Sequence, residues 1–413
     1  MLDDSTPSKP DVASVRAKVR AKLEYPKGAR EVLEGGEVRY LKPPLGTLLN
    51  LELVLGQDPD FYPLLGHNTF TDEVTWHGVP ITDERETLLN LQIQRYYRLS
   101  VATERVREVM MVICREHPYH PVREWLERLG WDGVPRMGSL LAKYAGADDT
   151  PLNTAISRKW MLSALARIMD PGCKVDTMMI LVGIQGALKS TFFQALCHDK
   201  AWFADTAIDI GDKDAFMALG GIWVYEIGEL TALQGREAEH VKAFLSSQSD
   251  RFRPPYGRNM VRRPRQGVFV GSTNSAEFLD DPTGSRRFWP VGCGGVVDVA
   301  GVERDHAQLW AEAMEARQAG ERWWFDAQEE KGLSAARDEY QRCDPWEESI
   351  REWLAKQMSS VTIRDVLNDA LGVQVQDQSM AMVRRSAAIV AAAGWKKKRA
   401  MLDGVQAWRW ERA

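Results

Sequence analysis

The chain has 413 residues, of which 44% are hydrophobic, 27% charged and 9% aromatic. This composition allows about two to four domains with sizeable cores and excludes a mostly disordered chain. With 53 basic and 58 acidic residues the net charge is −5, so the chain is not a polycation, and any nucleic-acid binding must come from local patches.

No apolar run approaches the ~20 residues needed to span a bilayer. The N-terminus has no hydrophobic segment typical of a secretory signal. Five scattered cysteines without a C-x-x-C pair argue against a disulfide framework or a zinc knuckle. We therefore expect a cytoplasmic protein with no membrane partner.

The first 175 residues predict an N-terminal arm with a small mixed region over 1–99, followed by a helical domain over 100–175. Apolar residues recur at helical spacing between 101 and 117, as in Val106, Val109, Met110 and Ile113. Further helices are expected over 122–129 and around 137–144. The mixed region contains turns at residues 57–59 and 78–80.

The centre of the chain, residues 176–295, predicts an α/β core. Residues 178–182 (MMILV) form an unbroken apolar run, as expected of a strand that is buried on both faces of a parallel sheet. Two later apolar runs, over 222–225 and 267–272, are separated by a helical stretch at 237–245. The order strand, helix and strand at these lengths predicts an α/β core.

The tail predicts a helical extension over 296–344 and a separate small domain over 345–413. Three helices are expected there, followed by two alternating segments that meet at Asp403-Gly404, a strong hairpin signal. This order resembles a winged helix, which binds DNA. The candidate DNA contacts are Arg384, Arg385, Lys396, Lys397 and Lys398.

The sharpest motif follows the first apolar strand and opens a helix, where a phosphate-binding loop must lie. Lys189 would reach the β- and γ-phosphates of ATP, and Ser190 would bind Mg²⁺. Leu188 replaces the glycine that usually precedes the lysine, which leaves the local backbone geometry open. The alternative to a phosphate-binding loop is that Lys-Ser-Thr occurs by chance at the start of a helix. The candidate cofactor-binding residues are Gly183, Gln185, Gly186, Ala187, Leu188, Lys189, Ser190 and Thr191.

Polar residues end the next two apolar strands. Glu226 and Glu229 could hold Mg²⁺ and orient the attacking water, with Glu226 as the candidate metal ligand. Asn274 could sense the γ-phosphate, because strand ends line the ligand crevice of such a sheet. Either acid alone is more often an exposed loop residue, and Asn274 alone is equally consistent with a turn.

Two arginine-containing segments complete the candidate site. Arg286 or Arg287 could be an arginine finger acting across a subunit boundary, or both could be surface charges. Residues 251–265 carry six arginines and no acid, interleaved with Phe252, as in single-strand binding loops, although a solvated basic loop is the alternative. The candidate DNA contacts here are Arg251, Arg253, Tyr256, Arg258, Arg262, Arg263 and Arg265.

Together these motifs resemble the virulence-associated E (VapE-like) family, which is similar to superfamily III helicases. The matching segments run from about residue 100 to residue 295, and their order is more specific than any one of them. They are residues 120–122, 131–133, 158–160, 170–174, 183–191, 226–230, 242–244, 253–258 and 283–291.

The resemblance implies a P-loop ATPase of a phage or other mobile element that acts on DNA in replication and works as a ring, with a hexamer expected. The predicted function is an ATP-dependent DNA helicase or translocase with ATP and Mg²⁺ as cofactors and single-stranded or origin DNA as partner. One rival is an ATP-switched DNA-binding initiator or regulator that does not unwind DNA. The other rival is a small-molecule kinase, and the arginine-rich loop argues against it.

Overall fold

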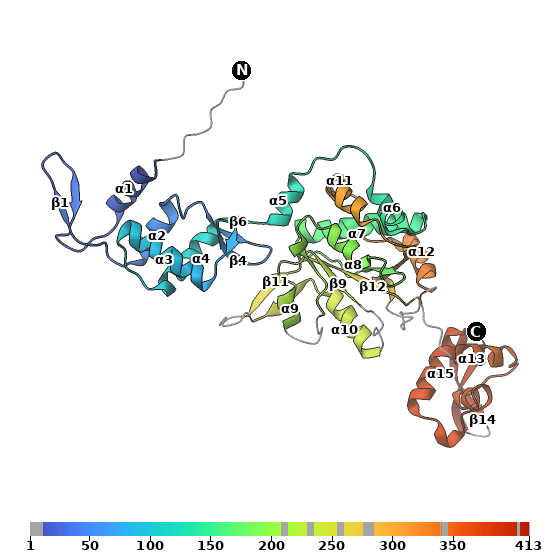
Figure 1. Cartoon of the computed structure of the whole chain (residues 1–413). Coiled ribbons are helices and arrows are strands. Elements are labelled where there is room, and N and C mark those ends of the chain that lie inside the picture. The colour runs from blue at the N-terminus through green and yellow to red at the C-terminus, as the bar shows by residue number, and fades with distance from the viewer. Residues whose placement is uncertain are drawn as a thin grey trace. The chain divides into compact units, whose positions relative to one another are not determined.

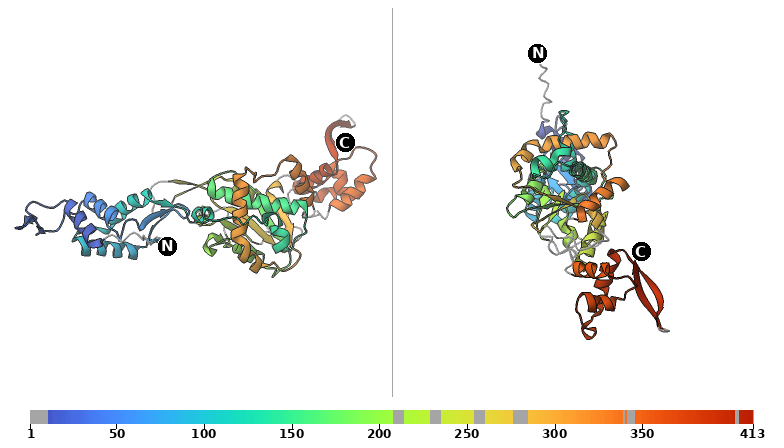
Figure 2. Two further views of the ribbon diagram at one scale, coloured as in Figure 1. Left: turned by 90° about the horizontal axis from the view of Figure 1, so that it is seen from above. Right: turned by 90° about the vertical axis from the view of Figure 1, so that its right-hand side faces the viewer.

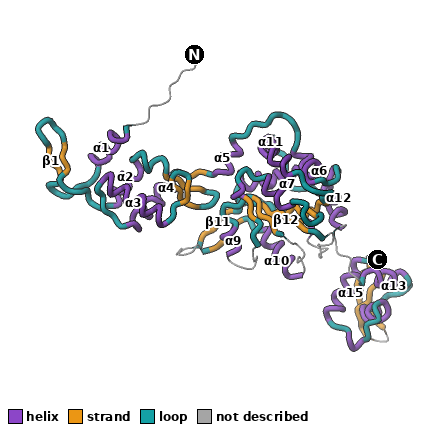
Figure 3. The backbone as a smooth tube through the Cα atoms, in the orientation of Figure 1, coloured by secondary structure: helices purple, strands orange, loops and turns teal. Residues whose placement is uncertain are grey.

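The computed structural model describes residues 11–207, 214–228, 235–253, 260–275, 285–338, 340, 346–402 and 405–412. The described residues divide into two compact units, the first up to Arg337 and the second from Asp338 onwards. Figure 1 traces the chain and Figure 3 distinguishes its helices from its strands. None of the helices in the described ranges is long and apolar enough to cross a membrane.

The N-terminal part of the first unit is built from four helices, a hairpin and a small sheet. Threonine side chains cap two of the helices, since Thr47 accepts from the Asn50 N–H and Thr82 from the Arg85 N–H. The helices are α1 (Val12–Lys22), α2 (Leu48–Gln57), α3 (Asp83–Tyr97) and α4 (Thr103–Glu116). The strands are β1 (Arg30–Val32), β2 (Val38–Tyr40), β3 (Leu65–Asn68), β4 (Glu73–Trp76), β5 (Val79–Pro80) and β6 (Pro118–Tyr119).

The helical segment predicted over 100–175 is divided between two hydrophobic cores. The apolar face of α4, including Val106 and Met110, packs with α2 and α3 in the N-terminal core. The helices α5 (Pro121–Glu127), α6 (Leu140–Ala145) and α7 (Pro151–Met169) instead belong to the core that surrounds the central sheet. The predicted helices are present, but their apolar faces do not form one separate core.

A parallel five-stranded sheet forms the centre of the unit, as the sequence predicts for a mixed α/β core. Its order is β13-β7-β12-β9-β8, and every neighbouring pair is parallel. All five residues of β7 are buried, which accounts for their unbroken apolar character. The strands are β7 (Met178–Val182), β8 (Phe203–Ala204), β9 (Val224–Ile227), β12 (Val268–Thr273) and β13 (Phe288–Gly292).

Helices pack around this sheet and share one large core with it. Helix α7 contacts α11 (Val299–Gln318), and α11 also contacts α8 (Lys189–Ala195). Trp223, which directly precedes β9, and Trp310 of α11 pack with their ring centroids 4.3 Å apart. The remaining helices of the unit are α9 (Asp214–Ala218), α10 (Gly235–Ser246) and α12 (Ala327–Asp338).

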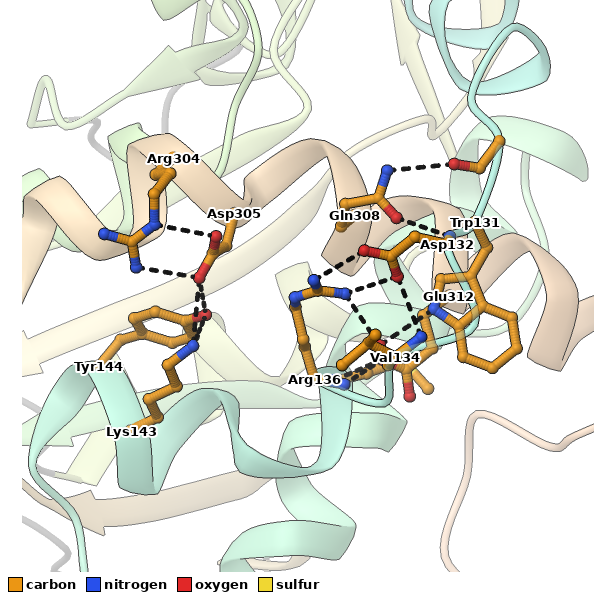
Figure 4. A network of polar contacts seen from close by, with 12 residues as sticks. Trp131, Asp132, Val134, Arg136, Lys143, Tyr144, Arg304, Asp305, Gln308 and Glu312 are labelled. Atoms are coloured by element: carbon orange, nitrogen blue, oxygen red, sulfur yellow. Dashed lines mark hydrogen bonds and ion pairs between the residues drawn. The ribbon is translucent and has the colours of Figure 1, made fainter.

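A network of hydrogen bonds and ion pairs also connects helix α11 to the segment that precedes α7 (Figure 4). The buried carboxylate of Glu312 accepts hydrogen bonds from the backbone N–H groups of Arg136 (2.5 Å) and Met137 (2.7 Å). Elsewhere in the network, Asp305 accepts from the Tyr144 hydroxyl at 2.6 Å. These bonds hold the 131–146 segment beside the central sheet.

The described part of the C-terminal unit contains three α-helices, a 3₁₀ turn over Val375–Asp377 and a hairpin. Helices α13 (Glu347–Ala355) and α15 (Met380–Ala392) pack around α14 (Ile363–Asp365), which continues as a π-helical turn over Val366–Ala370. Strands β14 (Trp395–Leu402) and β15 (Val405–Arg412) pair antiparallel, and Val361 forms a bridge to Trp410. The predicted turn residues 403–404 lie outside the described residues.

Candidate functional site

The predicted site residues converge on the carboxyl edge of the central sheet. The last residue of β7, Val182, pairs with Thr273 of β12 and with Gly292 of β13. Strand β9 lies on the other side of β12, with Glu226 opposite Val270. In open parallel sheets, ligand crevices form outside the carboxyl ends of the strands. The register therefore brings the loop after β7 beside the ends of β9 and β12.

The loop between β7 and α8 is held by backbone hydrogen bonds to its neighbours. The Gly183 N–H donates to the Thr273 carbonyl, and the Val297 N–H donates to the Ala187 carbonyl, each at 3.1 Å. Gly186 has a φ of 81°, which glycine adopts without steric cost. Gln185, Gly186 and Thr191 are exposed, whereas Ala187 is buried. The predicted phosphate-binding residues thus form a partly exposed loop that backbone hydrogen bonds hold at Gly183 and at Ala187.

Leu188, which departs from the usual motif, has a left-handed backbone with φ 62° and ψ 31°. That conformation costs a residue with a side chain about 1–2 kcal/mol relative to glycine. The Leu188 side chain is 46% exposed, so packing within the chain offsets little of this cost. The position therefore has the backbone that a glycine would favour, although the sequence provides leucine.

We expect Leu188→Gly to keep the fold and to change the free energy of unfolding by less than about 1 kcal/mol, because strain relief is offset by the larger backbone entropy of glycine in the unfolded chain. Urea denaturation measures this change. The matched variant Leu188→Val should be clearly less stable than wild type, because a β-branched residue is a genuine outlier at positive φ. A loss of more than about 2 kcal/mol in the glycine variant would contradict this explanation of the site.

The Lys189 side chain is buried inside the loop between β7 and α8. Its Nζ donates to the carbonyl oxygens of Gly183 (2.8 Å) and Ile184 (2.9 Å) and to Oδ1 of Asn274 (2.9 Å). The lysine therefore joins the loop after β7 to the first residue after β12. Lys189 and Asn274, which were predicted separately from two motifs, are direct neighbours.

Glu226 of β9 lies on the same edge and is only 2% exposed. The Ser190 hydroxyl donates to its Oε1 at 3.0 Å. Its second oxygen, Oε2, is buried and accepts no hydrogen bond within the described part of the chain. Burial raises the pKa of the Glu226 carboxyl, although the hydroxyls of Ser272 and Ser190 and the Lys189 ammonium group oppose this effect. The Glu226 carboxyl is thus buried at the sheet edge beside the Ser190 and Ser272 hydroxyls.

The raised pKa of Glu226 predicts a pH-dependent stability. Because the folded protein holds this proton more tightly than the unfolded chain, stability is lost as the pH rises from the ordinary glutamate pKa of 4.5 through the raised value. We expect Glu226→Gln to raise the thermal midpoint at pH 8, by about 2–4 °C for each kcal/mol gained. The gain should shrink as the pH falls towards 4.5.

The control is Glu303→Gln on the exposed side of α11, which should leave the thermal midpoint unchanged across the same pH series. A Glu226→Gln variant that is less stable than wild type at pH 8 would show that the carboxylate is compensated in the folded protein.

A second carboxylate near this edge was not predicted from the sequence. Ala204, the last residue of β8, pairs with Tyr225, so Asp205 follows at the position beside Glu226. The charge of Asp205 raises the pKa of Glu226. The only sequence signal was its place after Phe203–Ala204, a strand too short to give an apolar run. Glu229, the predicted second acid, lies outside the described residues.

The two candidate finger arginines have different surroundings. They belong to a 3₁₀ turn over Ser285–Arg287 that leads into β13. The Arg287 Nε donates to the Ser246 hydroxyl at the end of α10, at 3.0 Å. Arg286 is exposed. Of the two, Arg286 is therefore the one whose guanidinium group faces solvent.

The arginine-rich segment forms the antiparallel strands β10 (Ser249–Phe252) and β11 (Val261–Pro264), with Tyr256 and Arg258 outside the described residues. Arg251 lies directly opposite Arg262, and both are exposed, as is Arg253. Like charges in directly opposed positions destabilise a strand pair. This pairing favours an anionic ligand on the exposed face.

Two arginines at the base of this hairpin are bound within the protein. Arg263 donates to Asp72 Oδ2 at 3.0 Å, which ties β11 to the turn between β3 and β4. Arg265 is 4% exposed, forms an ion pair with Asp250 at 2.8 Å and also donates to the Phe244 carbonyl. The DNA contact predicted for Arg265 does not fit this geometry, because its guanidinium group is buried and paired.

The predicted basic residues of the C-terminal unit lie on α15 and β14. Arg384 and Arg385 are exposed on α15, and the Arg385 guanidinium lies 4.0 Å from the centroid of the Trp346 ring. Lys396, Lys397 and Lys398 are exposed on β14. Lys398 pairs with Glu411 at 2.8 Å, whereas the Lys397 Nζ lies 4.6 Å above the exposed Trp408 ring.

Comparison with known proteins gives one family match. The profile of the virulence-associated protein E-like domain matches residues 126–342, which is just over half of the chain. No match to a curated protein was found.

Several solved structures of the NrS-1 C-terminal region are distantly similar. Two apo structures have TM-scores of 0.47 and 0.46 at 10% identity, cover 84% of this chain and are themselves covered over 96% and 95% of their length. A third has a TM-score of 0.43 at 12% identity and covers 70% of this chain and 78% of its own.

Proposed function

The chain belongs to the virulence-associated protein E-like family, and on this premise we propose that it is an ATP-dependent DNA helicase or translocase acting in the replication of a phage or other mobile element. The observation that carries the proposal is the convergence of Lys189, Ser190, Glu226 and Asn274 on one sheet edge, joined by hydrogen bonds of 2.9–3.0 Å. The parallel sheet that positions them is consistent with a P-loop core.

These residues fit Mg-ATP. Among the described residues no cluster of three or more His, Cys, Asp or Glu could hold a metal by itself. Mg²⁺ in nucleotide sites usually takes only one or two protein ligands and completes its shell with phosphate oxygens and water. The Ser190 hydroxyl and the Glu226 carboxylate would supply such oxygen ligands. Lys189 supplies the positive charge.

Each residue would have a distinct role in hydrolysis. Lys189 would exchange its bonds to the Gly183 and Ile184 carbonyls for bonds to the β- and γ-phosphates. Asn274, which now accepts from Lys189, would contact the γ-phosphate or the attacking water. Glu226 would ligate the metal, and Glu229 or Asp205, as the second acid, would orient the attacking water and accept its proton. The metal, when bound, would neutralise charge that develops on the phosphates.

The β10–β11 hairpin is the proposed grip on single-stranded DNA. Phosphates between Arg251 and Arg262 would relieve the repulsion of these opposed charges. The C-terminal unit, with three helical segments and a hairpin, would add duplex or origin binding as a winged helix. We further propose that subunits assemble into a ring, with a hexamer expected, so that Arg286 reaches the site of a neighbour.

We expect the combined replacement of Arg251, Arg253 and Arg262 by glutamine to weaken single-strand binding while basal ATPase activity survives. The reason is that removing one arginine–phosphate ion pair reduces the salt dependence of log K by about 0.7. Fluorescence anisotropy with labelled oligonucleotide over a salt series measures the slope. Arg128→Gln, an exposed arginine after α5, is the matched control. An unchanged slope in the triple variant would move the DNA site elsewhere.

A strand-displacement assay tests the proposed activity directly. A motor releases a labelled strand only when ATP is hydrolysed, and the Lys189→Ala variant should release none. If the protein binds DNA and hydrolyses ATP but never separates strands, the non-motor alternative, an ATP-switched initiator or regulator, replaces the helicase proposal.

A further inference from the structure

Two histidine side chains from different elements face one another beyond the end of α8 that is opposite Lys189. His198 follows α8, and His306 lies in α11. The His198 Nδ1 and the His306 Nε2 are 3.5 Å apart. Helix α11 contacts both α8 and α5, and Figure 2 shows it in orange beside the green helices of the first unit. The packing of α11 against α8 therefore brings the two imidazole rings together.

A hydrogen bond determines which nitrogen of His306 carries a lone pair. The His306 Nδ1 lies 2.8 Å from the Glu303 carbonyl oxygen. Because a carbonyl oxygen only accepts, Nδ1 carries the proton of the neutral ring and Nε2 keeps its lone pair. Histidines that bind metals are usually oriented in this way, by a hydrogen bond from the other ring nitrogen. The nitrogen of His306 that faces His198 is thus the one that can bind a metal.

The indole ring of Trp125 in α5 holds both imidazole rings in place. It lies nearly parallel to the His198 ring, at 9° with centroids 4.8 Å apart, and to the His306 ring, at 15° with centroids 5.9 Å apart. Trp125 itself packs against the large core of the unit. Because stacking already restricts the two rings, binding a ligand removes less side-chain freedom than at a mobile surface site. His198 is exposed, so an ion can enter from solvent.

The distance between the two nitrogens fits a shared metal ion better than a hydrogen bond between the rings. At 3.5 Å it exceeds the ~2.7–3.2 Å that is usual for an N–H···O hydrogen bond. Two Zn–N bonds of about 2.0–2.1 Å at the tetrahedral angle separate their nitrogens by about 3.3–3.4 Å. The two imidazole rings therefore already have close to the spacing that a tetrahedral ion requires.

We propose that His198 Nδ1 and His306 Nε2 bind a Zn²⁺ ion, which links the end of α8 to α11. In the described part of the chain no third His, Cys, Asp or Glu completes the pair as a metal cluster, so water would occupy the remaining positions of the tetrahedron. Imidazole suits zinc, whereas Mg²⁺ prefers oxygen ligands. This site is therefore distinct from the Mg²⁺ site proposed at Ser190.

Isothermal titration calorimetry of the full chain with ZnCl₂, in excess MgCl₂ and without nucleotide, tests the proposal. His198→Ala and His306→Ala each remove one of the two protein ligands. Each should weaken zinc binding by at least about tenfold, since even the loss of a residue that only orients a ligand costs 10–100-fold. His240→Ala is the matched control, because His240 is an exposed histidine on α10. It should bind zinc like wild type. Circular dichroism confirms that each variant is folded.

A cysteine at position 198 separates zinc ligation from packing. His198→Cys loses the stacking on Trp125 as His198→Ala does, but a thiolate also binds zinc. Nδ1 is the ring nitrogen nearer the backbone, so the shorter cysteine side chain can reach the ion. His198→Cys should therefore bind zinc more tightly than His198→Ala, and equal binding by the two would overturn the proposal.

Three other results would also contradict a zinc site at this histidine pair. They are wild type that binds no zinc, alanine variants of His198 and His306 that bind it like wild type, and a His240→Ala variant that loses it equally. The titration contains no nucleotide and none of the ATPase residues takes part, so its failure would leave the proposed helicase function untouched.

Discussion

Replacing Lys189 with alanine is expected to abolish ATP hydrolysis while leaving the fold intact. In the structure the lysine ammonium group is held by the Gly183 and Ile184 carbonyls and by Asn274, a position from which it can turn to the phosphates. Hydrogen bonds to charged groups contribute about 1.5–3 kcal/mol each. Removing two such bonds to the transition state corresponds to a reduction of at least about 100-fold in rate.

Phosphate release measures this reduction, and thermal unfolding shows whether the variant is folded. Lys200→Ala is the matched control, because Lys200 is an exposed lysine beyond the end of α8. It should hydrolyse ATP like wild type. Unchanged turnover in folded Lys189→Ala protein would remove the loop after β7 from the ATPase site.

The central sheet and the position of most candidate site residues at its edge could be predicted because burial on both faces leaves a strong local signal. The run at 178–182 coincides with β7, and the runs predicted over 222–225 and 267–272 overlap β9 and β12. Parallel strands end at a common edge, so polar residues that follow them, such as Asn274, could be placed together from the sequence.

What could not be predicted depends on contacts between distant segments. Arg265 has the same local sequence context as the other arginines of its loop, and only the pairing with Asp250 across the hairpin base buries it. Asp205 follows a strand of two residues, Phe203–Ala204, which is too short to be recognised by periodicity. The apolar spacing of α4 predicted a helix but not the core against which that helix packs.

Mutation is expected to distinguish the roles of the two candidate finger arginines. Arg286 is exposed, whereas Arg287 donates to Ser246 within its own subunit. Arg286→Ala should therefore reduce hydrolysis, by as much as ~10³-fold if it resembles other arginine fingers, without weakening ATP binding. Arg287→Ala is the matched control. Without the hydrogen bond to Ser246 it should be about 1 kcal/mol less stable, and its hydrolysis should change little.

Mixing Arg286→Ala with Lys189→Ala subunits tests whether the arginine acts across a subunit boundary. Each variant alone lacks one half of every site. In mixed assemblies, a subunit with intact Lys189 can lie next to one with intact Arg286, and such an interface contains both halves. A finger that acts in trans therefore predicts partial recovery of hydrolysis, which rises with the fraction of mixed interfaces. If mixed assemblies form and activity never recovers, Arg286 acts within its own subunit or is structural, and the proposed catalytic ring loses its support.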